Sequence, residues 1–581
     1  MHASRAPQFD ADRLISGVID SRLRTSKKRR PSATQSRPAG SGKFDVISKG
    51  NRVSLSRSLF GHIACAALAL AAPTVVWAET LADAIAAAYD RDPQLVQQRY
   101  LQKARDENYV QSRAQYGPNV SVSSQGGYSY EKQSIIPGRG GWGESSSVTV
   151  TQPLYSSGRL RGQLAAAKAA VLGGREALRQ VEQQVVQNVI QVYAAVLRDE
   201  ARVDIARENV SVLQAQLEQN SKRQQLGDVT LTDVAQSEAR LAAAEIQLAS
   251  LEASLAVSRG EYLEVVGHNP GSLDPLPQLP TLPPSIDAAF DLAEQNNPSL
   301  HIAEYTEAQS SATAAATRGE QGPTVALNAR GTYQNSGGIL SFDGRSADKT
   351  AFAGVSISQP IFSGGAIRSR IREADARNRA DQAGIDIARR TAIQSVTNAW
   401  VQLSSARVSV TTGQRQVDAA QQAFAGMSCE ELNGLRSTIE TLNAEQELQA
   451  AQLQLMQSRY TVYVSHAALL AATGELSAQQ IADGITVYDP EANFKRVRFA
   501  GRTPFDLIAQ AIDRVGSAGL RLPYSQDLTG GNVPKPDQTG QLAPAPERAL
   551  MNRAVTPITK SQLKLPNGET GRCPLNSGRL R

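Results

Sequence analysis

Residues 152–164 of the chain read QPLYSSGRLRGQL, and residues 359–371 read QPIFSGGAIRSRI. The two segments begin 207 residues apart, and the same spacing separates Tyr193 from Trp400 farther along the chain. Upstream of the two segments the spacing is 205 residues. A loop whose length differs by two residues between the two halves would produce this change. A repeat of about 200 residues predicts an internal duplication and a fold with two similar halves.

The charge of the chain is concentrated at its N-terminus. The 581 residues carry a net charge of +6, but residues 1–57 alone contain 13 Lys or Arg and 4 Asp or Glu. The remainder is therefore slightly acidic, and the sequence gives no reason to expect a nucleic-acid partner. Cys65, Cys429 and Cys573 are too few for a disulfide scaffold and have no metal-ligand spacing.

The end of the basic segment has the pattern of an export signal. Arg52 and Arg57 precede the uncharged run LFGHIACAALALAAPTVVWA, which ends at Ala78. Small residues at the positions that a signal peptidase reads place cleavage after Ala78. A membrane anchor is the alternative, although the run is short for a membrane span. The first 50 residues are polar and aperiodic, as a start codon assigned too far upstream would produce.

Alternating polar and apolar residues predict one hairpin in each half. In NVSVSSQGGYSYE, which begins at Asn119, the apolar residues share one face of a strand and the polar residues share the other. We expect a first hairpin over 119–153, with its loop in the Gly- and Pro-containing segment 133–143. The repeat predicts a second hairpin over 324–360.

Long helices follow each hairpin. Residues 159–226 contain no Pro and are rich in Ala, Gln, Leu, Val, Glu and Arg, which favour helix. One continuous helix of this length would extend roughly 100 Å. Gly227 ends it, and a second helix follows over 228–267. The second half predicts helices over 366–433 and 435–474, with a turn at Gly434.

These elements define four segments of the chain. They are a leader and signal peptide over 1–78, a first structural repeat over 79–285, a second structural repeat over 286–478, and a tail over 479–581. The tail contains the amphipathic piece TPFDLIAQAIDRVG and is expected to be largely disordered, chiefly past about Gly516.

The strands determine the predicted architecture. Each has about the length that a tilted strand needs to cross a bilayer. Four strands do not close a barrel, and lipid does not tolerate open sheet edges. The chain is therefore expected to oligomerise, with two copies giving 8 strands and three giving 12. A soluble coiled-coil rod or a soluble four-stranded sheet are the alternatives, but the export signal argues against the sheet.

The body of the chain resembles the TolC family of outer-membrane channels of bacterial efflux pumps and type I secretion systems. The resemblance covers residues 79 to about 478. LGDVTLTDVAQSEARLAAAE (226–245) and LNGLRSTIETLNAEQELQAAQ (432–452) are similar to the family's two helix-turn-helix tips. The QPL and QPI segments resemble its strand-to-helix junctions. YDPEANFKRVR (488–498) looks like the tail of the BepC-type branch.

The resemblance implies an α+β membrane protein that works as a homotrimer. Three chains would form a 12-stranded antiparallel barrel in the outer membrane, continued by a long α-helical coiled-coil barrel in the periplasm. The implied partners are outer-membrane lipid, a periplasmic adaptor and an inner-membrane RND or ABC transporter. The duct would passively conduct drugs, other toxic compounds or secreted polypeptide, and no cofactor is implied.

The resemblance also assigns roles to individual residues. The implied periplasmic gate links a carboxylate to a guanidinium between neighbouring tips and lines the entrance with acidic rings, at Asp233, Arg436, Glu440 and Asn443. Asn443 replaces one acidic ring with a neutral amide, so cation block is expected to be weaker, and Glu431 stands where the family often has a Tyr of the lock. The implied adaptor-docking tips are Leu226, Gly227, Gly434 and Leu435. The implied strand-to-helix junctions are Pro153, Gly158, Pro360 and Gly365.

Other functional classes fit the sequence less well. The chain after the signal has three His residues (His268, His301 and His466) without metal spacing, and no nucleophile motif or phosphate loop. We therefore expect neither catalytic residues nor a metal site. An exported periplasmic coiled-coil adaptor is the better alternative, although an adaptor has no use for bilayer-length strands in both repeats. The sequence does not distinguish efflux from protein secretion.

Overall fold

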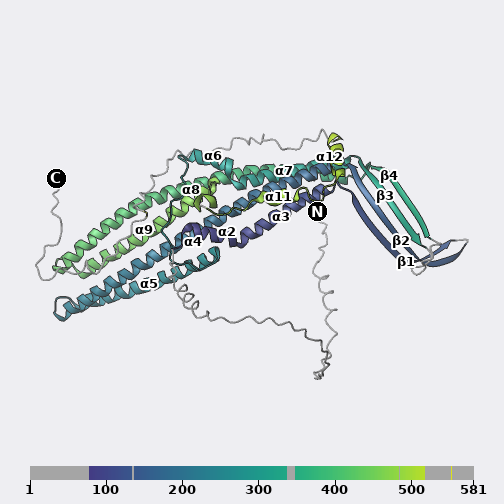
Figure 1. The fold of residues 1–581 in the computed structure, drawn as a ribbon. Coiled ribbons are helices and arrows are strands. Elements are labelled where there is room, and N and C mark those ends of the chain that lie inside the picture. The colour runs from purple at the N-terminus through teal and green to yellow at the C-terminus, as the bar shows by residue number, and fades with distance from the viewer. Residues whose placement is uncertain (1–77, 134–135, 336–346, 483, 517–550, 552–581) are drawn as a thin grey trace, which may run out of the picture. The chain divides into compact units, whose positions relative to one another are not determined.

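The computed structural model describes residues 78–133, 136–335, 347–482, 484–516 and Met551. By its internal packing the chain divides into Met1–Val75 and Val76–Arg581, and every described residue belongs to the second unit. This unit is mostly helical and contains one four-stranded sheet (Figure 1). Apart from Ala78 itself, the expected leader and signal peptide lie outside the described residues.

The same order of elements occurs twice along this unit. In the first half they are α2 (Leu81–Arg91), α3 (Pro93–Ala114), β1 (Asn119–Gln133), β2 (Ile136–Tyr155), α4 (Arg159–Gln225) and α5 (Leu231–Val266). In the second half they are α6 (Ile286–Asn296), α7 (Pro298–Arg318), the short 3-10 helix η2 (Gly319–Gln321), β3 (Thr324–Asn335), β4 (Ala347–Ser358), α8 (Ala366–Leu432) and α9 (Thr438–Thr473). The corresponding long helices have equal lengths, with 67 residues in α4 and α8 and 36 in α5 and α9.

Local sequence signals position the starts of the helices that lead into the strands. Asp92 and Asn297 precede Pro93 and Pro298, and each side chain accepts hydrogen bonds from the first free backbone N–H groups of α3 or α7. Pro fits the first turn of a helix because the N–H that it lacks has no partner there. The two halves therefore begin their second helices by the same device.

Helix α4 is packed on several sides. It contacts α3, α5, α7 and α9, while α8 contacts α7 and α9. Around α4, Val189 and Tyr193 belong to a buried apolar cluster that also includes residues of α2, α5 and α9. A second cluster around Trp400 and Leu403 of α8 includes residues of α6 and α9. Lengthwise burial of apolar side chains is thus the main stabilisation of these long helices.

The four strands form one antiparallel sheet in the order β1-β2-β3-β4. The register places Val122 opposite Val148 and Leu327 opposite Val355, so apolar residues gather on one face. Apart from Phe352 of β4, the opposite face is polar, with cross-strand hydrogen bonds between Ser123 and Ser147 and from Asn328 Nδ2 to Ser356 Oγ. The sheet is therefore two-faced, as the alternation in the sequence predicts. Its edge strands are β1 and β4.

The predicted loop of the first hairpin is wrong over most of its length. Residues 136–143 belong to β2 and pair with β1, including Trp142 opposite Tyr128. The rings of these two residues meet edge to face with their centroids 5.8 Å apart. Pairing with β1 thus makes these residues a strand, although their Gly- and Pro-rich composition indicates a loop. The connection between β3 and β4 lies outside the described residues.

The tail begins with three short helices, α10 (Ala478–Ile481), α11 (Pro490–Val497) and α12 (Pro504–Gly516). Helix α12 covers the predicted amphipathic piece and packs against β2, and α11 packs against α3. The guanidinium of Arg113 donates hydrogen bonds to the carbonyl oxygens of Arg498 and Ala500 between these helices. Residues 517–550 and 552–581, where disorder is predicted, lie outside the described part.

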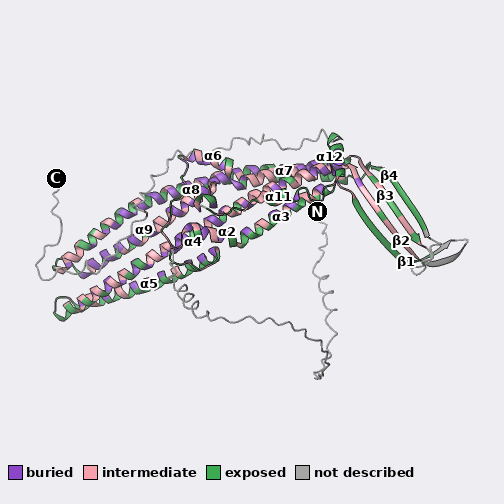
Figure 2. Ribbon diagram, viewed as in Figure 1, coloured by how far each residue is buried: buried purple, intermediate pink, exposed green. Residues whose placement is uncertain are grey.

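Large parts of the long helices remain exposed in the single chain (Figure 2). Within the described residues, α5 is the one helix long and apolar enough to cross a membrane by length and composition. It also carries eight charged residues, and Arg207–Glu252 and Glu200–Arg259 ion pairs of 2.8 Å and 2.9 Å join it to α4. These contacts assign α5 to the helical body.

Candidate functional site

The first tip joins α4 to α5. Helix α4 ends at Gln225 with Leu226 as its C-cap, and Gly227 turns the chain with φ of 84°, a left-handed conformation that favours glycine. Thr230 then begins α5 in a capping box with Asp233. The Asp233 carboxylate accepts hydrogen bonds from the backbone N–H and hydroxyl of Thr230, at 2.9 Å and 2.7 Å. Leu226 is 78% exposed at the outer end of this turn.

The second tip joins α8 to α9 in the same way. Gly434 has φ of 70°, and Leu435 beside it is 74% exposed. The Glu440 carboxylate accepts hydrogen bonds from the backbone N–H and hydroxyl of Ser437, at 3.1 Å and 3.0 Å. Each predicted tip therefore presents an exposed leucine next to its turn glycine, and the first tip exposes Leu231 as well.

Arg436 lies between two carboxylates of the second tip. Its guanidinium is 2.8 Å from Glu430 and 3.2 Å from Glu440. The pKa of Glu440 is lowered, first by the backbone and side-chain hydrogen bonds from Ser437 and then by Arg436. Glu440 is therefore ionised at neutral pH. All three side chains are partly exposed, so the pairs add little to stability and separate easily.

The structure does not bring Asp233 and Arg436 together within one chain. The ion pairs of Arg436 are with Glu430 and Glu440, and the carboxylate of Asp233 caps its own helix. An Asp three residues after Thr is a capping-box signal. The sequence TLTD (230–233) therefore predicts that Asp233 caps the start of its own helix.

A different arginine links the two tips within the chain. Arg240 of α5 donates a hydrogen bond to Asn443 Oδ1 of α9 at 2.9 Å, and another to Gln446. Arg240 lies seven residues after Asp233 and therefore near the same side of α5. That spacing could have identified Arg240, which the sequence analysis missed. Asn443, predicted as a neutral ring position, is thus also a hydrogen-bond acceptor for α5.

Glu431 forms a second link at the tips. This residue is buried, accepts a hydrogen bond from the Thr438 hydroxyl at 3.0 Å, and lies 3.8 Å from the guanidinium of Arg223 on α4. Glu431, which stands where the family often has a Tyr, is therefore a buried carboxylate that joins α4, α8 and α9. Its contacts are not deducible from spacing along one helix.

The strand-to-helix junctions lie far along the chain from the tips. Gly158 and Gly365 have φ of 81° and 83° and precede α4 and α8. Pro153 lies inside β2, where the pairing with β3 is irregular, whereas Pro360 follows the end of β4. The predicted junctions therefore differ, because the first proline lies within a strand and the second lies beyond one.

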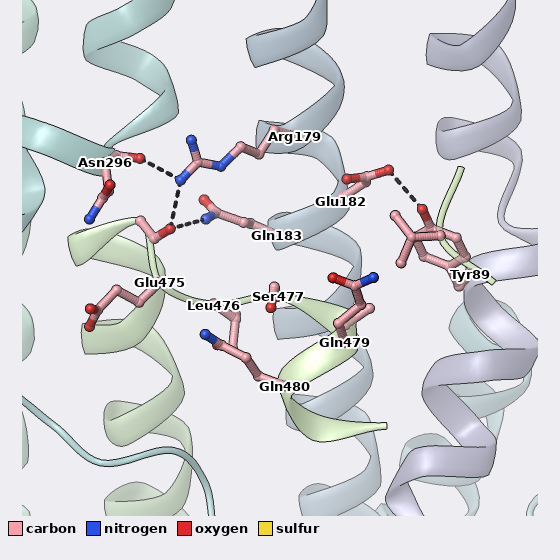
Figure 3. A pocket seen from close by; sticks show the side chains of 13 residues that line it. Tyr89, Arg179, Glu182, Gln183, Asn296, Glu475, Leu476, Ser477, Gln479 and Gln480 are labelled. Carbon is pink, nitrogen blue, oxygen red and sulfur yellow. Dashed lines mark hydrogen bonds between the residues drawn. The ribbon is translucent and has the colours of Figure 1, made fainter. Parts of the chain in front are cut away.

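An open pocket lies where α9 ends, as Figure 3 shows from close by. It encloses about 970 Å³ of empty space, open solvent included. Arg179 Nη2 donates to the carbonyl oxygens of Asn296 and Gly474, and Gln183 Nε2 also donates to that of Gly474. On the other side, the Tyr89 hydroxyl donates to Glu182. These groups hold the ends of α6 and α9 against α4, so we assign the pocket a structural role.

Metal chemistry has no support in the described part of the chain. No group of three or more His, Cys, Asp or Glu residues there is arranged to hold a metal ion. His268 and His301 contact Glu79 and Glu304, and His466 faces the carbonyl oxygen of Pro280. The three histidines therefore serve separate local contacts.

Comparisons of the sequence with known proteins identify its relatives. The sequence profile of outer membrane efflux proteins matches residues 84–263 and 289–475. Outer membrane efflux protein BepC of Brucella suis biovar 1 (strain 1330) is 29% identical over 430 residues, covering 73% of this chain and 92% of BepC. Alkaline protease secretion protein AprF of Pseudomonas aeruginosa is 24% identical, covering 68% of this chain and 84% of AprF.

A solved structure has the same fold. The Campylobacter jejuni CmeC outer membrane channel superposes with a TM-score of 0.63, covering 72% of this chain and 88% of CmeC. The two sequences are 15% identical, so this likeness concerns the fold alone.

Proposed function

Because the chain belongs to the TolC family of outer membrane efflux proteins and lies in the outer membrane, we propose that it forms the exit duct of a tripartite efflux pump or type I secretion system. Three copies build a 12-stranded barrel continued by a helical tunnel. The duct passively conducts drugs, other toxic compounds or secreted polypeptide to the exterior. An inner-membrane RND or ABC transporter supplies the cargo, and a periplasmic adaptor joins the two.

One observation carries this proposal, namely the two-faced sheet with unpaired edges. β1 and β4 each have a strand neighbour on one side within the chain. In lipid, an unpaired row of N–H and C=O groups is costly, so the edges pair between copies. The apolar face, with Val122 74% and Val355 62% exposed, then faces lipid, and the polar face lines the pore.

Exposed apolar residues on the helices support the same assembly. Ile387, Val401 and Val408 of α8 are 66%, 48% and 50% exposed and are separated by multiples of seven residues. A seven-residue apolar repeat is typical of a helix that packs lengthwise on another helix. On α5, Ile246 and Val257 are 73% and 61% exposed. We assign these stripes to contacts between neighbouring copies.

The gate is assigned to the two tips. Arg436 holds Glu430 and Glu440 in one copy, and Asp233 of a neighbouring copy is the further carboxylate that it reaches in the closed trimer. Exposed ion pairs are weak enough for a partner to break. Glu440 repeats around the threefold axis as a ring of carboxylates, whereas Asn443 gives a neutral ring beside Arg240. The exposed Leu226 and Leu435, beside Gly227 and Gly434, form the adaptor-docking tips.

Single-channel conductance in planar bilayers tests the proposal. The purified full-length mature protein is compared with Arg436→Ala and with Glu440→Gln, which keeps the capping box but removes the charge. Arg436→Ala is expected to enlarge small, noisy openings several-fold, and Glu440→Gln to relieve block by divalent cations. Arg415→Ala and Glu447→Ala, at exposed positions on α8 and α9, are matched controls.

Two outcomes would count against the proposal. If no folded, detergent-extracted oligomer conducts, the exit duct is excluded and an exported helical adaptor becomes the better assignment. If the protein conducts but Arg436→Ala behaves like Arg415→Ala, the duct stands and the gate residues are wrong.

A further inference from the structure

Helix α12 is fixed at the junction of β2 and α4. Its inner side carries Asp513, which is 1% exposed. Asp513 Oδ1 accepts hydrogen bonds from the backbone N–H and hydroxyl of Ser156, at 2.8 Å and 3.0 Å, and from the N–H of Gly158 at 3.2 Å. The Tyr116 hydroxyl donates to the other carboxylate oxygen at 3.2 Å. The helix is therefore held where the strand ends and the long helix begins.

The outer side of α12 is apolar and uncovered in the chain. Phe505, Ile508, Ile512 and Val515 are 56%, 54%, 43% and 80% exposed. Positions separated by three, four and three residues share one side of a helix. This apolar side lies next to the buried side that carries Asp513. One side of the helix therefore packs on the protein, and the apolar side remains exposed in the described part of the chain.

The location of α12 relates this apolar side to the sheet. Gln152 of β2 has the same strand parity as Val148 and Val150 on the apolar face, but it is 5% exposed. Gln152 Nε2 donates to the carbonyl oxygen of Tyr116 at 2.7 Å, and the Tyr116 side chain binds α12. On β2 the apolar face thus ends at Gln152, in the layer of residues that holds α12.

From this placement we infer that α12 lies in the periplasmic surface of the outer membrane, with Phe505, Ile508, Ile512 and Val515 in lipid. The inference rests on the proposed function, which places the apolar face of the sheet in the bilayer. An amphipathic helix of this kind lies in the membrane plane with its apolar side buried at the level of the headgroups and upper acyl chains.

Two features favour lipid over a second copy as the occupant. First, α12 packs against β2, an interior strand of the sheet, whereas neighbouring copies meet at the edge strands β1 and β4. Second, the exposed Arg502 lies two residues before α12 and the exposed Arg514 lies in its last turn. Basic side chains beside an apolar helix side complement an anionic phospholipid surface.

Fluorescence quenching by brominated lipid tests the inference. Phe505→Trp and Ile512→Trp are each made in the full-length mature protein carrying Trp142→Phe, which leaves the buried Trp400 as a constant background. Gln510→Trp, at a half-buried position on the side of α12 away from Phe505 and Ile512, is the control. The proteins are reconstituted in phosphatidylethanolamine and phosphatidylglycerol vesicles with acyl chains brominated near the headgroup.

We expect the added fluorescence of Phe505→Trp and Ile512→Trp to fall roughly twofold in brominated vesicles, because their side chains lie at the level of the bromines. Gln510→Trp is expected to change little. Fluorescence that resists brominated lipid but is quenched by aqueous acrylamide overturns the inference by placing the side in water. Protection from both quenchers overturns it by placing a second copy there.

The quenching of Trp142 fluorescence in the wild-type protein distinguishes failure of this inference from failure of the proposed function. In the wild-type protein, Trp142 lies on the apolar face of the sheet opposite Tyr128. Quenching of Trp142 by brominated lipid together with unquenched Phe505→Trp leaves the barrel in place and removes only α12 from the membrane. An unquenched Trp142 instead refutes the membrane placement of the sheet.

Discussion

Glu445 is a single carboxyl group that the fold keeps out of water. It is 2% exposed, and neither side-chain oxygen has a hydrogen-bond partner among the residues that the structure describes. It lines a small cavity between α9 and α4, which Glu208 of α4 also lines. Burial raises the pKa of Glu445 to about 8, and the positive charge of Arg240 on α5 opposes this only in part.

The stability of the protein should therefore depend on pH through Glu445. Between about pH 4.5 and pH 8 the unfolded chain has released this proton while the folded chain retains it. The free energy of unfolding therefore falls as pH rises through this window. We expect the Tm in detergent to drop from pH 5 to pH 8, and Glu445→Gln to reduce that drop.

Glu447→Gln is the control for this measurement, because Glu447 is exposed two residues along the same helix. It should leave the difference in Tm between pH 5 and pH 8 unchanged. An equal difference in wild type and Glu445→Gln would show that Glu445 is ionised in the folded protein.

Individual residues of the tips were predictable where one helix determines their role. Thr230 with Asp233 and Ser437 with Glu440 have capping-box spacing, and both boxes form. The contacts of Arg240 with Asn443 and of Glu431 with Thr438 join different helices. They depend on how α5, α8 and α9 come together, which spacing along one helix does not determine.

At the scale of elements, α4 and α7 approach each other closely at Gly162. A Cβ atom placed on Gly162 would lie 2.6 Å from the backbone nitrogen of Ala316 and 2.8 Å from the carbonyl oxygen of Ala312. Both neighbours are backbone atoms of α7 and do not move without a shift of the helix. The absence of a side chain at Gly162 is thus needed for this helix contact.

Gly162→Ala should therefore lower the stability of the protein. The added methyl group forces the two helices apart, and overpacking of this kind costs about 1–3 kcal/mol. Gly260→Ala, in α5, is the matched control because a Cβ there has no atom within 4 Å in the chain. It should leave the Tm unchanged or raise it, since Ala favours helix. Equal Tm values for the two variants would contradict the close approach.

The helices were easier to predict than the strands. A Pro-free run of helix-favouring residues bounded by glycines locates α4 and α8 directly. In β2, by contrast, Pro137 and the nearby glycines indicate a loop, but pairing with Tyr128 and Tyr130 extends the strand through them. Such pairing joins residues on different strands, so the local composition of one strand does not predict it.

At the scale of the whole molecule, the described part of the chain leaves strand edges and an apolar helix surface uncovered. Its sheet has unpaired edges, and α8 has an exposed apolar stripe with a spacing of seven residues. The family and the outer-membrane location were predictable from the tip motifs and are confirmed. The trimer and its contacts stay predictions, because one chain contains half of each interface.

Disruption of the α8 stripe should weaken assembly. Val401→Asp with Val408→Asp places two unpaired charges in the proposed contact between copies, where charges are costly. We expect the trimer mass measured by light scattering in detergent to fall to that of smaller species. Gln402→Asp with Ser409→Asp, also exposed and seven residues apart, is the control and should remain trimeric. A double Val variant that stays as trimeric and heat-resistant as wild type would place the contact elsewhere.

The uninterrupted 67 residues of α4 and of α8 also set the distance that the protein can span. Each residue adds 1.5 Å, so each long helix fixes a distance of roughly 100 Å between the strand ends and the tips. Seven residues added to α4 would lower one tip by roughly 10 Å and require an equal addition in α5. The gap between two membranes that such a duct can bridge is therefore set by the number of residues in its long helices, 67 in each.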